Sequence, residues 1–464
     1  MSSIRQPETP LVDTHAHLDS GQFRVDVDAV IARAGEFGVG TILTVGCDLD
    51  SSRAGIELAR RFPQVYASVG IHPHDAATVD TAALAALKEL AAQDKVVAIG
   101  EVGLDFYRDR APRDLQRQAL RAQIRLAREL GKPLIVHDRD AHAEVLTILR
   151  EEGASEVGGV MHCFSGDLEL ARACVALGFF VSFAGPLTYP NSTLCKVAAE
   201  LPIDVMLVET DCPYLAPQPW RGKRCEPAFV LATAETLAAI KGLTLEDVAR
   251  ITSLNAFRLF GIGAIDQRTR IAYTIRNSLY LNITNRCTNH CTFCAKFRDF
   301  TVKGHQLCLE REPTAAEVIA AIGDPAGFTE VVFCGYGEPL LRLDLVKEVA
   351  AWLKGRGVMV RINTDGQANL VHGRNILPEL VGLVDVISVS LNAPDATTYQ
   401  RICQSACGEA GFHAIVDFLR EAPRYIPVVV ATAVTLPGID IAACRRIATE
   451  LGVTFRERTY NEVG

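Results

Sequence analysis

Apolar and polar positions alternate in two regular patterns along about the first 260 residues. Short runs rich in β-branched residues are separated by segments with helical spacing, such as TAALAALKELAAQ and DLQRQALRAQIRLARELG. The strand-like runs are LVDTHAHL, GVGTILTVGC, QVYASVGIHP, VVAIGEVGLD, PLIVHDRD, GGVMHCFSG, FFVSFAGPL and DVMLVETDCP. Eight strands, each followed by a helix, predict a (β/α)8 barrel.

After ITSLNAFRLFGIGAIDQRTR the pattern begins again but stops earlier. The later runs are NSLYLNITNRC, TEVVFCGYGEP, VMVRINTDG, VDVISVSLNA, VVVATAVTLPG and VTFRERTY. Six strands predict a second, incomplete barrel. The expected fold is therefore α/β: an N-terminal TIM-type (β/α)8 barrel over residues 1–263, a short linker over 264–276, and a C-terminal partial (β/α)6 barrel over 277–464.

Composition narrows the class of protein. Apolar residues make up 49% of the 464 positions and charged residues 22%, which predicts well-packed globular structure. The opening MSSIRQPETP does not resemble a signal peptide, and no apolar run is long enough for a membrane span. We expect a cytoplasmic protein without membrane association, whose 14 cysteines are reduced thiols or metal ligands.

A net charge of −8 argues against extensive, sequence-independent coating of duplex DNA, because such binding needs many Lys and Arg contacts to phosphates. This charge is compatible with nucleic acid binding over a small area, such as binding of a strand end by metal ions.

Metal-competent side chains lie at the predicted C-terminal strand ends of the first barrel, where barrel enzymes carry their chemistry. They are His15, His17, Glu101, His137, His162 and Asp211. His15 and His17 are two residues apart, so they point to the same side of the first strand. Six such groups on one rim predict a metal site. Imidazole and carboxylate together suit Zn²⁺, Mn²⁺, iron or, with more water, Mg²⁺.

Residues 11 to 261 resemble the TatD-type metal-dependent deoxyribonucleases of the amidohydrolase superfamily. The resemblance rests on DTHAHLD, TVGCDLDSS, VGIHPHDA, IGEVGLDF, HDRDA, HCFSG, ETDCPYL and RGKRCEP. It implies two divalent ions (Mg, Mn or Zn): one held by His15, His17, Glu101 and Asp211, the other by Glu101, His137 and His162. It also implies phosphodiester hydrolysis at the end of a DNA or other nucleic acid, with Glu101 and Asp211 catalytic and Asp211 the general base.

Neighbouring residues are candidate substrate contacts. His72 ends the third strand, and Arg139 has the geometry of a phosphate clamp, although pairing with Asp138 or Asp140 is an alternative. Arg221 belongs to a basic loop, RGKRC, in which Cys225 stands where the family usually has asparagine. Glu209 is either a partner of a metal ligand or a buried structural group. Five cysteines are expected to be small buried apolar residues: Cys47, Cys163, Cys174, Cys195 and Cys212.

A cysteine array follows the first strand of the second barrel. Cys287, Cys291 and Cys294 form a C-x3-C-x2-C pattern, which offers three thiolates where structural zinc needs four ligands. His290 is adjacent to Cys291, which makes joint ligation awkward, and Cys308 is a possible fourth ligand. Three thiolates on a 4Fe-4S cluster leave one iron open to a cofactor or substrate.

The same segment resembles the radical S-adenosylmethionine (SAM) enzymes, with Phe293 as the aromatic residue before the third cysteine. The resemblance implies one 4Fe-4S cluster, SAM, and an electron donor such as flavodoxin or ferredoxin. It also implies eight cofactor contacts: Phe293, Gly335, Gly337, Glu338, Asn363, Thr364, Ser390 and Asn392. Glu338, in CGYGEPLL, would receive the amino group of SAM.

The residues and the two resemblances together predict a bifunctional enzyme, a metal-dependent phosphodiester hydrolase acting as a DNA exonuclease joined to a radical SAM unit of unknown substrate. In the alternative, the first barrel hydrolyses esters or amides, for example on aminoacyl-tRNA, and the second domain is a non-catalytic iron-sulfur sensor or docking module.

Overall fold

The chain divides into two compact units, with the boundary between Ile265 and Asp266. The computed structural model describes residues 6–297 and 299–460. Each unit has its own apolar core and is described by itself.

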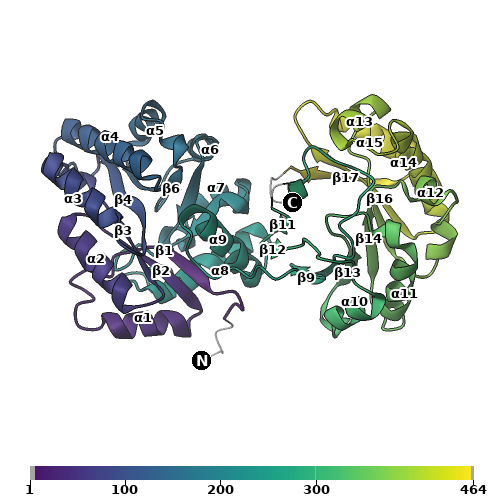
Figure 1. The fold of residues 1–464 in the computed structure, drawn as a ribbon, viewed down its shortest axis with the longest axis horizontal. Coiled ribbons are helices and arrows are strands. Elements are labelled where there is room, and N and C mark those ends of the chain that lie inside the picture. The colour runs from purple at the N-terminus through teal and green to yellow at the C-terminus, as the bar shows by residue number, and fades with distance from the viewer. Residues whose placement is uncertain (1–5, 298, 461–464) are drawn as a thin grey trace. The chain divides into compact units, whose positions relative to one another are not determined.

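Eight parallel strands form the first unit in the order β1 to β8, so the predicted (β/α)8 barrel is confirmed (Figure 1). They are β1 (Leu11–Ala16), β2 (Val39–Val45), β3 (Val65–Val69), β4 (Val96–Asp105), β5 (Leu134–Arg139), β6 (Gly159–Met161), β7 (Phe179–Phe183) and β8 (Met206–Val208). The seam between β1 and β8 closes just beyond the strands. There the Asp211 amide donates to the His15 carbonyl over 2.9 Å, and the His17 amide donates to the Cys212 carbonyl over 2.8 Å.

The helices of the first unit are α1 (Val27–Glu36), α2 (Leu49–Arg61), α3 (Thr81–Ala91), α4 (Arg113–Leu130), α5 (His142–Glu151), α6 (Leu168–Ala176), α7 (Leu194–Glu200), α8 (Val230–Lys241) and α9 (Leu245–Phe260). Their ends follow local chemistry. Asp48 and Ser51 form a capping box at the start of α2, and α4 ends at Gly131, whose φ of 62° suits glycine. These helices bury an apolar face against the strands, which fixes the strand ends that carry the site.

A seven-stranded sheet forms the second unit, in the order β17-β16-β15-β14-β13-β10-β9. The strands are β9 (Ala272–Ile275), β10 (Ser278–Leu281), β13 (Glu330–Phe333), β14 (Val360–Thr364), β15 (Val386–Ser390), β16 (Val428–Thr435) and β17 (Thr454–Thr459). The six predicted strands, β10 and β13 to β17, are parallel neighbours in chain order, as an incomplete barrel requires.

Strand β9 lies inside the segment 264–276, which was expected to be linker. It pairs antiparallel with β10 through a two-residue turn at Arg276 and Asn277, and Arg276 has a positive φ of 55°. Such a turn usually contains glycine, so a hairpin at Arg276 and Asn277 is not predicted by the residues of its turn.

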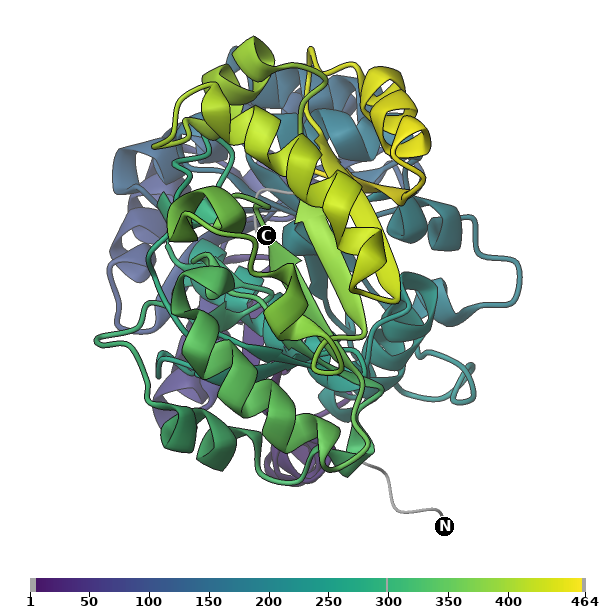
Figure 2. The same ribbon diagram turned by 90° about the vertical axis from the view of Figure 1, so that its right-hand side faces the viewer.

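The helices of the second unit are α10 (Ala315–Ile322), α11 (Leu343–Lys354), α12 (Ala368–His372), α13 (Ala396–Cys403), α14 (Ala410–Glu421) and α15 (Ile441–Glu450). Figure 2 shows the green and yellow helices of this unit lying over the outer face of its strands. A small hairpin, β11 (Thr301–Val302) and β12 (His305–Gln306), follows the cysteine segment.

Within the described ranges, which include all 14 cysteines, every cysteine is free. No single helix there is both long enough and apolar enough to cross a membrane. Two helices, Pro227–Lys241 and Leu245–Phe260, reach that length and hydropathy only when they are taken together, and the chain bends sharply between them.

Candidate functional site

The six predicted metal ligands of the first unit come together at one end of the barrel. His15, Glu101 and His137 lie in β1, β4 and β5, whereas His17, His162 and Asp211 lie directly beyond β1, β6 and β8. Parallel strands bring their carboxyl ends to the same rim, and this brings residues 15 and 211 into contact.

Glu101 lies at the centre, and its two oxygens face different ligands. Oε2 is 3.5 Å from His15 Nε2 and 3.8 Å from His17 Nε2. Asp211 Oδ1 completes this side, 3.3 Å from His17 Nε2 and 3.8 Å from His15 Nε2. Four ligand atoms from three strands therefore surround one point.

The other oxygen of Glu101 faces a second set of histidines. Oε1 is 2.7 Å from His137 Nδ1 and 2.8 Å from His162 Nε2. His72 lies beside them, with Nε2 3.6 Å from the same oxygen. Burial lowers the pKa of His72 to about 3, so its imidazole is neutral and keeps a lone pair at neutral pH.

These distances fit bound divalent cations. Three overlapping groups of ligand atoms lie within 4.8 Å of one another: His15, His162 and Asp211; His15, His17 and Glu101; His72, Glu101 and His137. Two donors that each bind one ion at about 2.0–2.2 Å lie roughly 3–4 Å apart, which is the spacing seen here. The third group also shows that His72, expected as a substrate contact, has the position of a ligand.

The charged groups of the cluster hold each other in place. Burial alone would raise the pKa of Glu101, but the charge of His162 and the hydrogen bond with His137 hold it well below its ordinary range. Burial likewise opposes ionisation of Asp211, yet its hydrogen bond with His17 and the neighbouring imidazoles lower its pKa. Both carboxylates are therefore ionised and available to cations.

A surrounding layer of hydrogen bonds orients the histidines. The His17 Nδ1 lies 3.2 Å from the Val45 carbonyl, which leaves its Nε2 facing the cluster. Glu209 Oε1 lies 3.4 Å from His162 Nδ1 and accepts a 2.6 Å hydrogen bond from the Cys163 amide. Glu209 thus has both roles that the sequence left open, as partner of a ligand and as a buried structural acceptor.

Two residues of this layer were missed from the sequence. Buried Asp105 lies 3.4 Å from His137 Nε2 and 2.8 Å from His74 Nε2. It shares a face of β4 with Glu101, four residues earlier, and this even spacing was the available signal. Cys47, expected to be simply apolar, places Sγ 3.7 Å from His17 Nδ1 and 3.7 Å from Glu101 Oε2.

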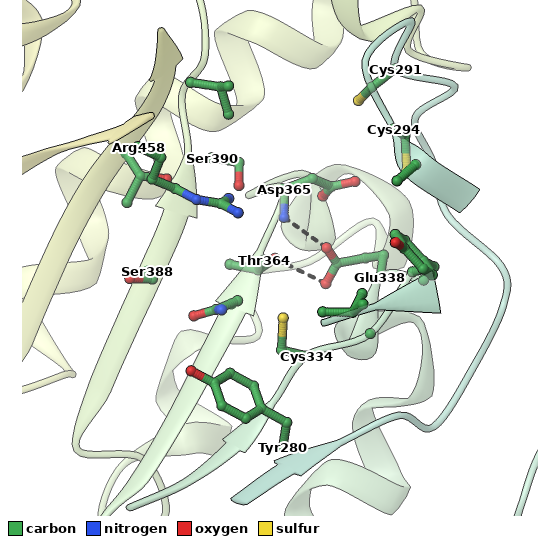
Figure 3. A pocket seen from close by; sticks show the side chains of 18 of the residues that line it. Tyr280, Cys291, Cys294, Cys334, Glu338, Thr364, Asp365, Ser388, Ser390 and Arg458 are labelled. Carbon is green, nitrogen blue, oxygen red and sulfur yellow. Dashed lines mark hydrogen bonds between the residues drawn. The ribbon is translucent and has the colours of Figure 1, made fainter. Parts of the chain in front are cut away.

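The second unit contains a cavity of about 520 Å³ inside its sheet (Figure 3). Its lining includes all eleven residues assigned from the sequence to the cluster and cofactor: Cys287, Cys291, Phe293, Cys294, Gly335, Gly337, Glu338, Asn363, Thr364, Ser390 and Asn392. Its size is that of a pocket for a small molecule.

Glu338 is buried in this wall and fixed by three hydrogen bonds. It accepts from the Asp365 amide over 2.7 Å, the Thr364 hydroxyl over 2.9 Å and the Leu340 amide over 2.9 Å, and Figure 3 shows the first two. Burial, with the neighbouring charge of Asp365, raises the pKa of Glu338 well above its ordinary value. Two buried carboxyls side by side form a place for a cation, and Asp365 was not foreseen.

The glycines before Glu338 allow close packing of backbone. A Cβ at Gly335 would lie 2.4 Å from Asn282 Oδ1, and one at Gly337 would lie 2.2 Å from the Thr284 carbonyl oxygen. They bring the end of β13 against the segment that leads to Cys287.

The cysteine segment is held by the region around α13. The Asn289 side chain donates to the Tyr399 hydroxyl over 2.7 Å and accepts from Gln367 over 2.8 Å. A hydrogen bond with Cys403, together with burial, raises the pKa of Cys291. Cys403, the last residue of α13, therefore contacts the array.

The three thiols are not gathered as ligands of a single zinc ion would be. The sulfurs of Cys287, Cys291 and Cys294 are absent from the groups of described ligand atoms that lie within 4.8 Å of one another. Thiolates about 2.3 Å from one Zn²⁺ would lie roughly 3.8 Å apart. Neither His290 nor Cys308, the fourth ligands considered, is among the described residues that line the cavity.

Comparison with known proteins decides the family. Residues 12–261, more than half of the chain, match the family described as TatD related DNase. The chain belongs to this TatD family. Residues 281–451 match the Radical SAM superfamily, so the TatD unit is followed by a radical SAM domain.

The TatD unit has relatives in bacteria. It is 48% identical to the metal-dependent hydrolase YabD of Bacillus subtilis over 253 residues, 54% of this chain and 99% of YabD. The 3'-5' ssDNA/RNA exonuclease TatD of Escherichia fergusonii is 37% identical over 258 residues, 54% of this chain and 99% of that protein. The crystal structure of YJJV, a TatD homologue from Escherichia coli, aligns with a TM-score of 0.52 and 30% identity, covering 54% of this chain and 98% of YJJV. The chain is thus a metal-dependent hydrolase of the TatD family.

Arginines at the mouth of the TatD site lie on aromatic rings. The Arg139 guanidinium is 4.3 Å from the centre of the Tyr107 ring, whereas the carboxylate of Asp138 is hydrogen-bonded to His142. Arg221 lies 4.3 Å from the centre of the Tyr189 ring. Both arginines are exposed, so their charges face solvent.

The loop after Arg221 is held by ion pairs. Arg224 binds Asp26 over 2.7 Å and Glu226 over 2.8 Å. Cys225, which stands in place of the usual asparagine, is buried with Sγ 4.0 Å from the Thr210 carbonyl. It packs beneath the segment that carries Asp211.

Proposed function

We propose that the chain is a bifunctional enzyme whose TatD unit hydrolyses phosphodiesters at the end of a DNA or related nucleic acid strand. The observation that supports this most is the position of Glu101, whose two oxygens face two different sets of ligands. Phosphodiester hydrolases commonly use such paired sites. The family relative named a 3'-5' ssDNA/RNA exonuclease points to the same substrate class.

His15, His17, Glu101 and Asp211 would hold one divalent ion, and Glu101, His137 and His162 a second. Mg²⁺, Mn²⁺ and Zn²⁺ are all compatible with these donors. When bound, such a pair supplies Lewis-acid activation of the phosphodiester and of the attacking water.

Asp211 would accept the proton of that water. Its lowered pKa keeps it ionised, and its backbone is fixed by neighbours. Thr210 donates to buried Asp13 through its amide (2.9 Å) and its hydroxyl (2.6 Å), and the Asp211 amide is bonded across the barrel seam. A base held this way keeps one orientation through the reaction.

The two arginine–aromatic pairs, together with Tyr214 beside His17, would bind the strand. Tyr107 is 59% exposed and Tyr214, whose ring centre is 6.0 Å from that of His17, is 54% exposed. Exposed rings stack on unpaired bases, and guanidinium groups such as Arg139 and Arg221 bind phosphates. His72, so close to Glu101, would contact the scissile phosphate or a metal ion.

The test is an assay of the full-length, metal-loaded protein on end-labelled single-stranded DNA and, in parallel, on an aminoacyl ester. We expect stepwise shortening of the DNA, and no shortening with Glu101→Gln. Turnover of the ester alone would replace the nuclease assignment with the ester hydrolase alternative.

For the second unit we propose a working radical SAM enzyme. Cys287, Cys291 and Cys294 would hold a 4Fe-4S cluster, and Glu338 would receive the amino group of SAM, with Asn363, Ser390 and Asn392 along the cavity wall. When bound, cluster and SAM supply a one-electron reductive cleavage of SAM. The electron would come from a donor such as flavodoxin or ferredoxin.

This proposal is tested by anaerobic reconstitution followed by incubation with dithionite and SAM. We expect 5′-deoxyadenosine to form. Product at the level of a Cys294→Ala control would favour the alternative, in which the domain is a sensor or docking module.

A further inference from the structure

The wall of the cavity formed by β17 carries two cations. Arg456 and Arg458 lie two residues apart on β17, so their side chains leave the same face of the strand, and both line the cavity. Figure 3 shows Arg458 extending toward the middle of the cavity near Ser390.

Glu330, at the start of β13, is a carboxylate whose charge acts on Arg456, and it is already paired. Glu330 binds Arg361 through both oxygens, at 2.7 Å and 2.9 Å, and also accepts a 2.9 Å hydrogen bond from Ser278. Glu457, between the two arginines, pairs with Arg445. Among residues 6–297 and 299–460, no carboxylate lies within ion-pair distance of Arg456 or Arg458.

The electrostatic surroundings agree with this geometry. Burial, and then repulsion from the guanidinium groups of Arg361 and Arg458, lowers the pKa of Arg456. An excess of positive charge in a partly enclosed cavity attracts an anion.

Hydroxyl groups complete the surroundings of the two arginines. Arg456 Nη2 lies 3.5 Å from the hydroxyl of buried Ser388, and Ser390 and buried Thr432 line the same wall. Guanidinium forks with adjacent hydroxyls match the oxygens of a phosphate or carboxylate.

Arg456 and Arg458 lie at the other end of the strand order from Glu338, the residue assigned to the amino group of SAM, and Ser390 lies between them as a lining residue of the same cavity. Strands β14, β15 and β16 separate β17 from β13, and Glu338 directly follows β13. The amino and carboxylate groups of SAM share one carbon atom, so an amino group at Glu338 keeps its carboxylate on that side.

We propose that Arg456 and Arg458 bind an anionic, oxygen-rich group, a phosphate or a carboxylate, on the molecule that the radical unit modifies. The inference rests on the proposed radical SAM function, and it names the chemical class of the substrate. An uncharged substrate would leave these two cations without a partner.

The test is protection of arginines from phenylglyoxal in the reconstituted full-length protein, read residue by residue with mass spectrometry. Inorganic phosphate and acetate are the probes. At a concentration of about ten times the Kd, one of them should slow modification of Arg456 and Arg458 by about tenfold, because an occupied site does not react. Arg445, a neighbour that pairs with Glu457, is the control and should be unaffected.

The variant Arg456→Gln provides a second measurement. With one arm of the site removed, protection of Arg458 by the same anion should fall severalfold, whereas Arg445→Gln should leave it as in the wild type. Protection by SAM alone, with neither anion effective, would assign the arginines to the carboxylate of SAM and overturn the proposal. Equal protection of Arg445 would also overturn it.

The outcome is separable from the radical chemistry. Anion protection is measured without reductant, so it does not depend on SAM cleavage. If the arginines are protected but no 5′-deoxyadenosine forms, the proposed radical activity is refuted and the anion site is kept. If 5′-deoxyadenosine forms but the arginines are not protected, only the anion site is refuted.

Discussion

Glu101 is the residue on which the proposed metal centre would depend, because its one side chain faces both groups of candidate ligands. Glu101→Gln removes the negative charge that both cations would share. It also replaces one carboxylate oxygen with an amide nitrogen, which donates hydrogen bonds and does not bind a cation. Substituting a residue that only hydrogen-bonds to a metal ligand typically costs up to about 100-fold in activity. We expect Glu101→Gln to reduce the rate of hydrolysis by more than this. Bound metal, measured by elemental analysis, should fall with it.

Glu209→Gln is the matched control, since Glu209 contacts His162 from behind and faces no second ligand group. Its loss should cost about 10- to 100-fold in metal affinity or rate. Equal effects of the two substitutions would contradict the bridging role of Glu101.

In the second unit, Glu338 is the carboxylate on which the proposed binding of SAM depends. Its pKa is raised because burial and Asp365 disfavour its charge, and a bound ammonium group would reverse this. Glu338→Gln should weaken SAM binding by about 10- to 100-fold, the value of a hydrogen bond between charged groups. Equilibrium binding to the reconstituted protein measures this, with exposed Glu348→Gln as the control. Unchanged SAM affinity in Glu338→Gln would remove Glu338 from the cofactor site.

At the scale of elements, the contact between the end of β13 and the segment after β10 positions the cysteine array. Gly337→Ala would place a methyl group 2.2 Å from the Thr284 carbonyl oxygen, so that segment must move. We expect a loss of about 1–3 kcal/mol in stability, as overpacking usually gives, and less iron per protein after reconstitution.

Gly327→Ala is the control for this change, because nothing lies within 4 Å of the added atom there. It should keep the wild-type iron content and unfolding midpoint. Full iron content in Gly337→Ala would show that the packing of β13 does not govern the array.

At the scale of the whole molecule, the two units should respond differently to chelators. Removing divalent ions from the first unit leaves its clustered imidazoles and carboxylates without their shared partner. Bound ligand at about 1,000 times its Kd contributes roughly 4 kcal/mol, so its removal should speed hydrogen exchange around the ends of β1, β4 and β8. Residues 278–459 should exchange as before.

Glu101→Gln protein is the reference for this experiment, since it should hold little metal and respond little to chelator. Equally increased exchange in both units would mean that the divalent ions stabilise more than the first barrel.

Every predicted strand is present, because strands of a parallel sheet are buried on both faces and appear as nearly continuous apolar runs. Strand β9 escaped prediction since its pairing is decided by the turn at Arg276, not by an apolar pattern. The ligand rims were predictable from strand ends alone. Contacts such as His74 with Asp105, 31 residues apart, or Cys403 with Cys291, depend on packing that local spacing does not encode.

The seam that closes the first barrel has a consequence for biosynthesis. His15 and His17 leave the ribosome early, but the Asp211 amide that binds the His15 carbonyl follows almost two hundred residues later. A nascent chain therefore holds an incomplete set of donors until its last strand docks against its first. Acquisition of the full complement of ions becomes a report that the chain has been translated past Asp211 and that the first barrel has closed.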